Sequence, residues 1–361
     1  MSRPSLAKQL AIAAAVLALL AVSIALVIIR GPDWGKVGTS FAAVRWYWVV
    51  IALCLNFLSI VVRALAWKTV IDQALEPPRP GHRAVFSAFS VGLFGNAVLP
   101  GRIGELARVA VLTRRFNGRK GAWATLVGTV FAHRVFDLFP VLVLVAFVLQ
   151  TAQIPDWAHA ALKLFVFLAA LLFLVAFVFA TRRRGSPLDG LGPVRRLLRM
   201  ARYGLTVMHT PAAAGVAIAF QISGWLLQLL AVYSTMRAFE IHAPLSAAAM
   251  VLLLMNIATV FPLWPGNIGL VQAAIAVPLA SYGVAIAHGI AFGFGLQAIE
   301  ASVGIGLGMT FLAREGISYA TLKGMPEATE IELQGESSGD PGRPVEKREA
   351  ERKPRSKRRL K

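Results

Sequence analysis

The stretch Pro100-Gly101-Arg102-Ile103-Gly104 recurs 165 residues later as Pro265-Gly266-Asn267-Ile268-Gly269. Each copy interrupts a region that is otherwise apolar. Proline lacks the backbone N–H and glycine lacks a side chain, so the pattern breaks a helix and leaves backbone groups unpaired. Within a membrane, such a break is tolerated only where protein or a water-filled cavity supplies hydrogen-bond partners. The two copies therefore predict two broken helical segments, each beside a cavity.

Long apolar blocks surround the two motifs. They cover residues 9–29, 47–67, 123–149, 160–180, 212–233 and 289–312. Each is close to the roughly 20 residues that a helix needs to cross a bilayer. Charged residues make up 15% of the chain, against about 25% in soluble domains. We expect an all-α polytopic membrane protein with six spanning helices, the first of them uncleaved because it is longer than a signal-peptide core.

The broken segments are predicted to be re-entrant hairpins that enter and leave the membrane on one side. Both chain termini then share a side with 30 of the 37 Lys and Arg residues, and only four lie on the other side. Basic residues accumulate in cytoplasmic loops. The prediction is a multi-pass protein of a bacterial inner membrane with cytoplasmic N- and C-termini.

The matching positions of the two motifs predict an internal repeat. Repeat one runs from about 46 to 150 and repeat two from about 207 to 313, within a transmembrane domain of residues 1–315. The two hairpins would enter from opposite sides, which makes the halves inverted-topology repeats, an arrangement that places sites near the bilayer midplane. Residues 316–361 are rich in charge and poor in apolar side chains, which predicts a disordered, basic cytoplasmic tail.

Ionisable side chains within spans are costly and are functional-site candidates. The candidates are Arg63, Arg102, Glu105, Arg108, His133, Arg134, Asp137 and Glu300. Glu105 and Arg108, like Arg134 and Asp137, are three residues apart and share a helix face. Structural alternatives exist: Arg63 at the end of its block could snorkel to the interface, Arg134 and Asp137 could merely neutralise each other, and His133 could be a packed histidine.

The breaks themselves are candidates for binding an anion. Helices that start after Gly101 and Gly266 would present free N–H groups and the positive end of a helix dipole to a phosphate. The binding candidates from the two motifs are Asn96, Pro100, Gly101, Gly104, Pro265, Gly266, Asn267 and Gly269.

Several functions are excluded by what the sequence lacks. It has one cysteine and six histidines without metal-ligand spacing, so no metal site, disulfide or cofactor is expected. It has no soluble-enzyme motif and no Walker loop, so we predict no catalytic residues. The net charge of +19 resides in loops and tail, where it sets topology, and no nucleic-acid partner is expected.

Asn96 to Arg108, the Arg134-x-x-Asp137 pair and the second motif together resemble the lysylphosphatidylglycerol synthase transmembrane region, also called the flippase-like domain family. The resemblance covers about residues 10–315. The family's second motif commonly reads Pro-Gly-Gly-x-Gly followed by a glutamate, whereas this chain has Asn267 and Gln272. The resemblance implies movement of an aminoacylated phospholipid across the membrane. It does not imply synthase activity. In multidomain members of the family a separate soluble domain performs the aminoacyl transfer, and the roughly 45 residues after the last block are too few for that domain.

The function that we predict is a lipid flippase or transporter-like protein that handles a phospholipid or polyprenyl-phosphate headgroup. Its partners would be anionic, aminoacylated or polyprenyl-phosphate-linked membrane lipids. One alternative is a non-transporting membrane partner of a glycosyltransferase or another cell-envelope biosynthesis enzyme. A second is an intramembrane enzyme that acts on a lipid headgroup, with Glu105 and His133 as an acid–base pair.

Overall fold

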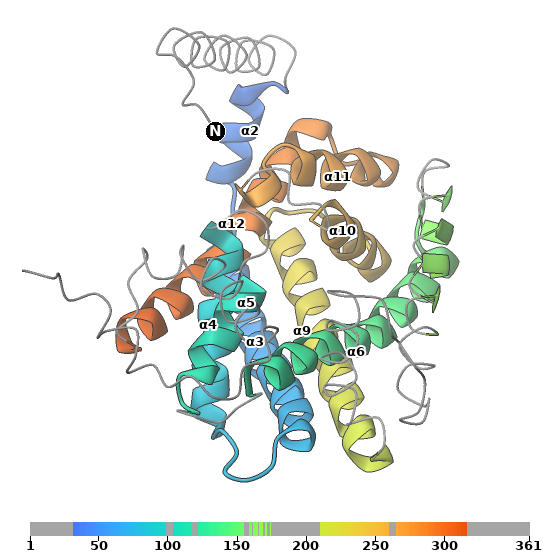
Figure 1. The fold of residues 1–361 in the computed structure, drawn as a ribbon. Helices are drawn as coiled ribbons and strands as arrows, with labels where there is room; N and C mark the ends of the chain where they lie inside the picture. The colour runs from blue at the N-terminus through green and yellow to red at the C-terminus, as the bar shows by residue number, and fades with distance from the viewer. Residues whose placement is uncertain are drawn as a thin grey trace, which may run out of the picture. The chain divides into compact units, whose positions relative to one another are not determined.

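The computed structural model describes residues 32–98, 104–116, 122–154, 210–259 and 265–315, together with parts of 159–174. In this part of the chain the regular elements are all helices (Figure 1). The chain divides into two compact units, Met1–Ile317 and Ser318–Lys361. All described residues belong to the first unit, and the predicted tail lies outside them.

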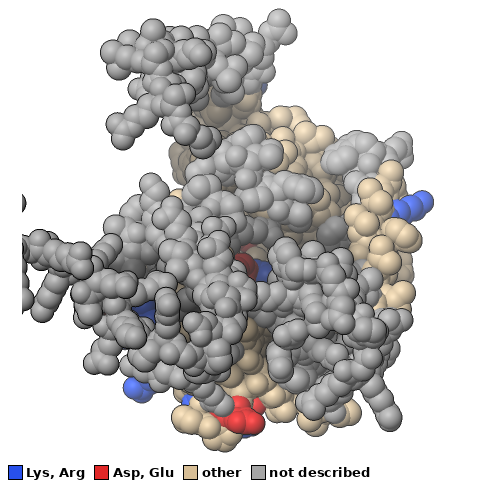
Figure 2. Space-filling view, viewed as in Figure 1, with Lys and Arg blue, Asp and Glu red and all other residues tan. Residues whose placement is uncertain are grey.

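Four of the described helices are long and apolar enough to cross a membrane. They are α3 (Trp46–Ala74), α6 (Ala122–Thr151), α9 (Pro211–Ala238) and α12 (Ile286–Arg314). They correspond to four of the six predicted spans. The predicted span 9–29 lies outside the described residues, as does most of 160–180. Figure 2 shows that the visible described surface is mostly uncharged, as a lipid-facing surface requires.

At each of the two broken regions the chain forms two short helices instead of one long spanning helix. In the first half α4 (His82–Val98) precedes the break and α5 (Gly104–Thr113) follows it. In the second half the order is α10 (Leu245–Ala258), the 3₁₀ turn η3 (Pro265–Asn267), α11 (Leu270–Leu279) and the 3₁₀ turn η4 (Ala280–Tyr282). The second predicted break is confirmed, because Gly266, Asn267 and Gly269 have positive φ between α10 and α11; the first break, at residues 99–103, lies outside the described residues.

The two halves repeat the same sequence of helices. The series long, short, short, long occurs as α3, α4, α5, α6 and again as α9, α10, α11, α12. The first residues of the four equivalent pairs are 163 to 166 residues apart: Trp46 and Pro211, His82 and Leu245, Gly104 and Leu270, Ala122 and Ile286. These offsets are close to the 165-residue spacing of the two Pro-Gly motifs.

Helices α3 and α9 pack antiparallel along their full lengths. The N–H of Arg45, before α3, donates to the carbonyl of Ala238 at the end of α9 (2.9 Å). At the other end, Thr210 before α9 contacts Gln73 (3.3 Å). Midway, the Ser59 hydroxyl donates to the carbonyl of Gly224 (2.8 Å). Helices α3 and α9 thus run in opposite directions, and Ser59 meets Gly224, which lies 165 positions later in the chain.

The two ends of the first hairpin lie close together. Ser87 near the start of α4 and Arg115 just after α5 both donate to Oε1 of Glu315, at 2.7 and 2.5 Å. Between these ends, α4 and α5 cross at Gly92 and Gly104, where a Cβ on Gly104 would lie 1.9 Å from the Gly92 carbonyl oxygen. Only glycine permits this backbone approach.

In the second hairpin, the connection that follows α11 forms hydrogen bonds with Gln153, just after the end of α6 in the first half. The hydroxyl of Tyr282 accepts from the N–H of Gln153 (2.7 Å), and the hydroxyl of Ser281 donates to the Gln153 carbonyl (3.2 Å). Helix α10 is buried throughout Ser246–Met255, consistent with its apolar character on every face. It packs against α6, α9 and α11 in the largest core.

Three details differ from the sequence-based expectation. A short helix, α2 (Trp34–Ala42), precedes α3, with Asp33 accepting from the N–H of Lys36 as its N-cap (3.2 Å). Helix α3 continues seven residues past the predicted block, because Lys68 pairs with Asp72 one turn later. The helix after the second break begins at Leu270, not directly after Gly266.

Candidate functional site

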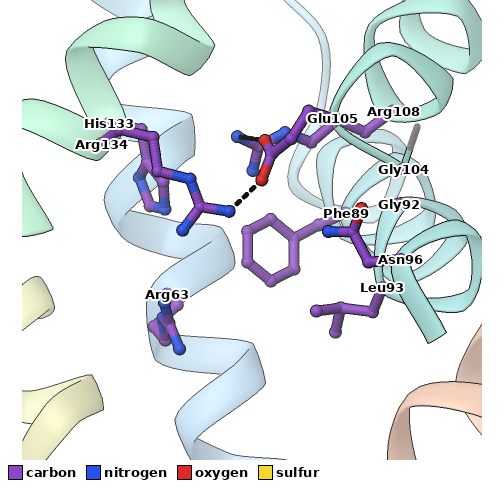
Figure 3. Close-up of a pocket in the computed structure, with 10 residues that line it drawn as sticks. All are labelled: Arg63, Phe89, Gly92, Leu93, Asn96, Gly104, Glu105, Arg108, His133 and Arg134. Carbon is purple, nitrogen blue, oxygen red and sulfur yellow. Dashed lines mark hydrogen bonds and ion pairs between the residues drawn. The ribbon is translucent and has the colours of Figure 1, made fainter. Parts of the chain in front are cut away.

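A cavity of about 40 Å³ lies between the first hairpin, α3 and α6 (Figure 3). Its lining residues are Arg63, Phe89, Gly92, Leu93, Asn96, Gly104, Glu105, Arg108, His133 and Arg134. Because a buried water occupies roughly 10–15 Å³ by this measure, the cavity has room for about three water-sized groups. A single phosphate group fits this space, whereas an entire phospholipid headgroup does not.

A chain of ion pairs runs along the cavity. Glu105 is contacted by Arg108 (Oε2 to Nη2, 2.5 Å) and by the Nη2 of Arg134 (Figure 3). Arg134 also donates through Nη1 to Oδ2 of Asp137 (3.2 Å), and Oδ1 of Asp137 lies 3.6 Å from Nη2 of Arg63. Buried charges are retained in proteins only when they are paired and hydrogen-bonded. These five side chains therefore act as one unit that joins α3, α5 and α6.

Arg108 is held on an aromatic support. Its guanidinium carbon lies 4.6 Å from the centre of the Trp67 ring and 5.5 Å from that of Phe89. The Trp67 indole is itself fixed by donating to the hydroxyl of Thr129 (3.1 Å). Cation–π contacts strengthen when they are desolvated, and the Arg108 side chain is only 4% exposed. The cation is thus pre-positioned against the cavity.

Two side chains of the second half hold Asp137 in position. Its Oδ1 accepts from the amide of Gln221 (2.8 Å) and from the indole N–H of Trp225 (3.0 Å), both on α9. Two neutral donors and two arginines hold this buried carboxylate in one orientation. The ionic chain of the first half is consequently anchored to a helix of the second.

Glu300 on α12 joins the network through a glutamine. Gln228 donates to Oε1 of Glu300 (3.3 Å), and its carbonyl oxygen accepts from Nη1 of Arg63 (3.2 Å). Arg63 and Gln228 are 165 residues apart, as are Ser59 and Gly224. The link between the halves is therefore made by equivalent residues where α3 crosses α9.

Several polar atoms of the lining have hydrogen-bonding capacity to spare. Among the described residues, Nε of Arg63, Nε of Arg108, Nδ1 of His133 and Oδ1 of Asn96 are buried without a hydrogen-bond partner. All four residues line the cavity. Leaving buried polar atoms unpaired is costly, so this concentration at one place is characteristic of a binding site.

The second break has a different, uncharged surrounding. Gly266, Asn267 and Gly269 all adopt positive φ (70°, 45° and 92°), which explains the glycines of the motif. Asn267 donates to the carbonyl of Ala258 (2.9 Å), and Gln272 accepts from the N–H of Gly269 (2.6 Å). The N–H that was predicted to face an anion is thus occupied by a side chain.

A second glutamine completes this uncharged cluster. Gln297 on α12 accepts from Gln272 (2.7 Å) and donates to the carbonyl of Gly266. The three amide side chains of Asn267, Gln272 and Gln297 therefore hold the turn between α10 and α11. They leave the break hydrogen-bonded without any ionic contact among the described residues of the cluster.

The structure brings together most predicted site residues. Asn96, Gly104, Glu105, Arg108, His133, Arg134 and Arg63 line the cavity, and Asp137 and Glu300 connect to it. Gly266, Asn267 and Gly269 form the separate second cluster, with Pro265 at the start of its turn. Pro100, Gly101 and Arg102 lie outside the described residues. Their binding roles stay predictions.

Three residues of the network were missed from sequence. Gln221, Trp225 and Gln228 recur at spacings of four and three in α9, so they lie on one face of a helix that is otherwise apolar. Polar side chains in this pattern within a span are a usable signal, because interhelical hydrogen bonds favour them there. Searching only for ionisable residues overlooks them.

Long apolar helices, interrupted helices beside them and a buried ionic network define a polytopic helical membrane protein. The chain belongs to the lysylphosphatidylglycerol synthase TM region family, whose model matches residues 9–308. The predicted family is thereby confirmed.

The curated relatives are described only as membrane proteins. A UPF0104 membrane protein of Methanothermobacter thermautotrophicus is 26% identical over 288 residues, covering 72% of this chain and 82% of the relative. A second one from the same organism is 24% identical over 280 residues, covering 72% and 80%. The UPF0104 membrane protein MJ1078 of Methanocaldococcus jannaschii is 24% identical over 187 residues, covering 51% and 77%. No solved structure matches the chain.

Proposed function

We propose that this protein is a lipid transporter that moves a phosphate-containing headgroup across the membrane and binds the phosphate group of that headgroup in the cavity between α3, α5 and α6. The observation that carries the proposal is the ion-pair chain of Arg108, Glu105, Arg134, Asp137 and Arg63 along this cavity. Charges within spanning segments are expensive and mark substrate pathways in transporters. The substrates would be anionic, aminoacylated or polyprenyl-phosphate-linked lipids.

The proposed architecture has six spanning helices and two re-entrant hairpins in inverted-topology repeats. Its support is the antiparallel packing of the equivalent helices α3 and α9, with equivalent residues meeting at Ser59 and Gly224. A twofold axis in the membrane plane relates halves in this way. The joined ends of the first hairpin at Glu315 favour its entering and leaving on one side.

The proposed location is a bacterial plasma membrane, with both termini in the cytoplasm. The distribution of Lys and Arg between the two sides supports this orientation. We propose no enzymatic step, since a pathway for a headgroup needs only binding and release.

Purified protein in liposomes tests the transport proposal. Fluorescent analogues of phosphatidylglycerol, an aminoacylated phosphatidylglycerol and a polyprenyl phosphate are placed in the inner leaflet, and their appearance outside is followed by quenching. We expect at least one analogue to cross faster than in empty liposomes. Arg134→Gln should slow this about tenfold or more, because it breaks contacts to two carboxylates.

The matched control is Arg45→Gln. Arg45 pairs with Glu240 at 2.8 Å, but both side chains are about half exposed and lie outside the cavity, so its loss should leave transport unchanged. If no analogue moves faster than in empty liposomes, the transporter proposal is wrong. If the Arg134→Gln variant moves lipid as fast as the unchanged protein, the cavity is not the pathway.

A further inference from the structure

Glu105 occupies the position between two guanidinium groups. Its Oε1 accepts from Arg134, and its Oε2 lies 2.5 Å from Nη2 of Arg108. Guanidinium groups recognise carboxylate and phosphate oxygens with the same planar geometry. An oxyanion that enters the cavity therefore meets the best donors already engaged by a carboxylate of the protein itself.

The cation on one side of this position is fixed before any ligand arrives. Arg108 is almost wholly buried, rests on Trp67 and Phe89, and keeps its Nε without a hydrogen-bond partner among the described residues. Arg63, the third guanidinium of the lining, also has an unpartnered Nε. The cavity thus offers spare donors next to a carboxylate, which is the arrangement that an incoming phosphate would use.

The cation on the other side is the more exposed one. The Arg134 side chain is 45% exposed, against 4% for Arg108. Arg134 also contacts Asp137, so it keeps one carboxylate partner when it releases the other. Exchange of anions is therefore easier at Arg134 than at Arg108.

We propose that the cavity binds one phosphodiester oxyanion between Arg108 and Arg134, and that Glu105 is the internal anion which this ligand displaces. The inference deepens the proposed transport function and rests on it for the lipid source of the phosphate. Among the described ion pairs, the one between Glu105 and Arg134 is the one that joins α5 to α6. Displacing Glu105 would therefore also break the described ion pair between α5 and α6, through which binding would be coupled to movement of the α4–α5 hairpin.

Binding to the purified protein in detergent tests the displacement. The probes are a short-chain soluble phosphatidylglycerol and inorganic phosphate, and the readouts are calorimetric affinity and the rise in unfolding temperature that a ligand of the native state produces. We expect Glu105→Gln to bind the short-chain lipid about tenfold more tightly, the size of a typical coupling between two competing ligands. Arg108→Gln should weaken binding about tenfold or more.

The control is Glu240→Gln, which removes the carboxylate of an arginine pair outside the cavity and should leave affinity unchanged. If Glu105→Gln does not unfold cooperatively, Glu105→Asp replaces it. The shorter side chain cannot reach both arginines and should tighten binding by a smaller factor. Affinity that is unchanged or weaker in these Glu105 variants, or equally tightened by Glu240→Gln, overturns the proposal.

Two outcomes separate this inference from the transport proposal. Tighter binding in Glu105→Gln without any lipid movement in liposomes supports the displaced carboxylate and contradicts transport. Lipid movement with unchanged affinity in Glu105→Gln supports transport and contradicts the displacement. Tightening for inorganic phosphate but not for the short-chain lipid overturns the lipid headgroup as the source of the phosphate.

Discussion

Replacing Gly104 with alanine would place a Cβ 1.9 Å from the carbonyl oxygen of Gly92 and 2.6 Å from Oδ1 of Asn96. Ordinary contacts between such atoms are about 3.5 Å, so α4 and α5 must separate by more than 1 Å. The nearest obstacle is backbone, which cannot rotate away as a side chain can. Overpacking typically costs about 1–3 kcal/mol, and we expect Gly104→Ala to reach the upper end, about 3 kcal/mol.

The assay is thermal unfolding of the purified protein in detergent, followed by tryptophan fluorescence. The matched control is Gly306→Ala in α12, where a Cβ would meet no atom within 4 Å. Alanine favours a helix over glycine by about 1 kcal/mol, so Gly306→Ala should be neutral or slightly stabilising. If Gly104→Ala unfolds at the same temperature as Gly306→Ala, the close crossing of α4 and α5 is wrong.

Two further predictions concern helix direction and access to the cavity. In a cysteine-free background, a short bifunctional reagent should join a pair of cysteines placed at Gln73 and Thr210. The same reagent should not join cysteines placed at Arg45 and Thr210. The reverse result would refute the antiparallel packing of α3 and α9. Glu315→Gln should release the two ends of the first hairpin, because it removes the charge that holds Arg115, and a cysteine at Asn96 should then react severalfold faster with a soluble maleimide. An unchanged labelling rate would show that this contact does not control access.

The features that could be predicted from the sequence are local ones. Apolar blocks of spanning length became α3, α6, α9 and α12, because length and hydropathy decide whether a helix can cross a membrane. The pairs Glu105–Arg108 and Arg134–Asp137 also form as expected, since residues three apart on a helix are neighbours. The Arg63 side chain, for which snorkelling to the interface was the alternative, lies 3.6 Å from Asp137 in the network.

The features that could not be predicted depend on packing between distant segments. The pair of Glu105 and Arg134 joins residues 29 apart, and the contact of Trp225 with Asp137 joins residues 88 apart. Nothing in either helix alone selects these partners. Local hydrogen bonding also shapes the second break: the Gln272 side chain accepts from the N–H of Gly269, a contact that the Pro-Gly pattern alone does not predict.

With the 165-residue offset of the two Pro-Gly motifs, the charged residues of the first half can be compared with the corresponding positions of the second. At the positions equivalent to Glu105, Arg108 and Arg134, the second half has Leu270, Ala273 and Ile299. An ionic network duplicated at both breaks would bury twice as many charges and incur their desolvation cost twice. The second half supplies neutral donors from α9 and one carboxylate, Glu300 on α12, so most of the charge gathers at one site beside the crossing of α3 and α9. The second break is instead a turn held by the hydrogen bonds of Asn267, Gln272 and Gln297.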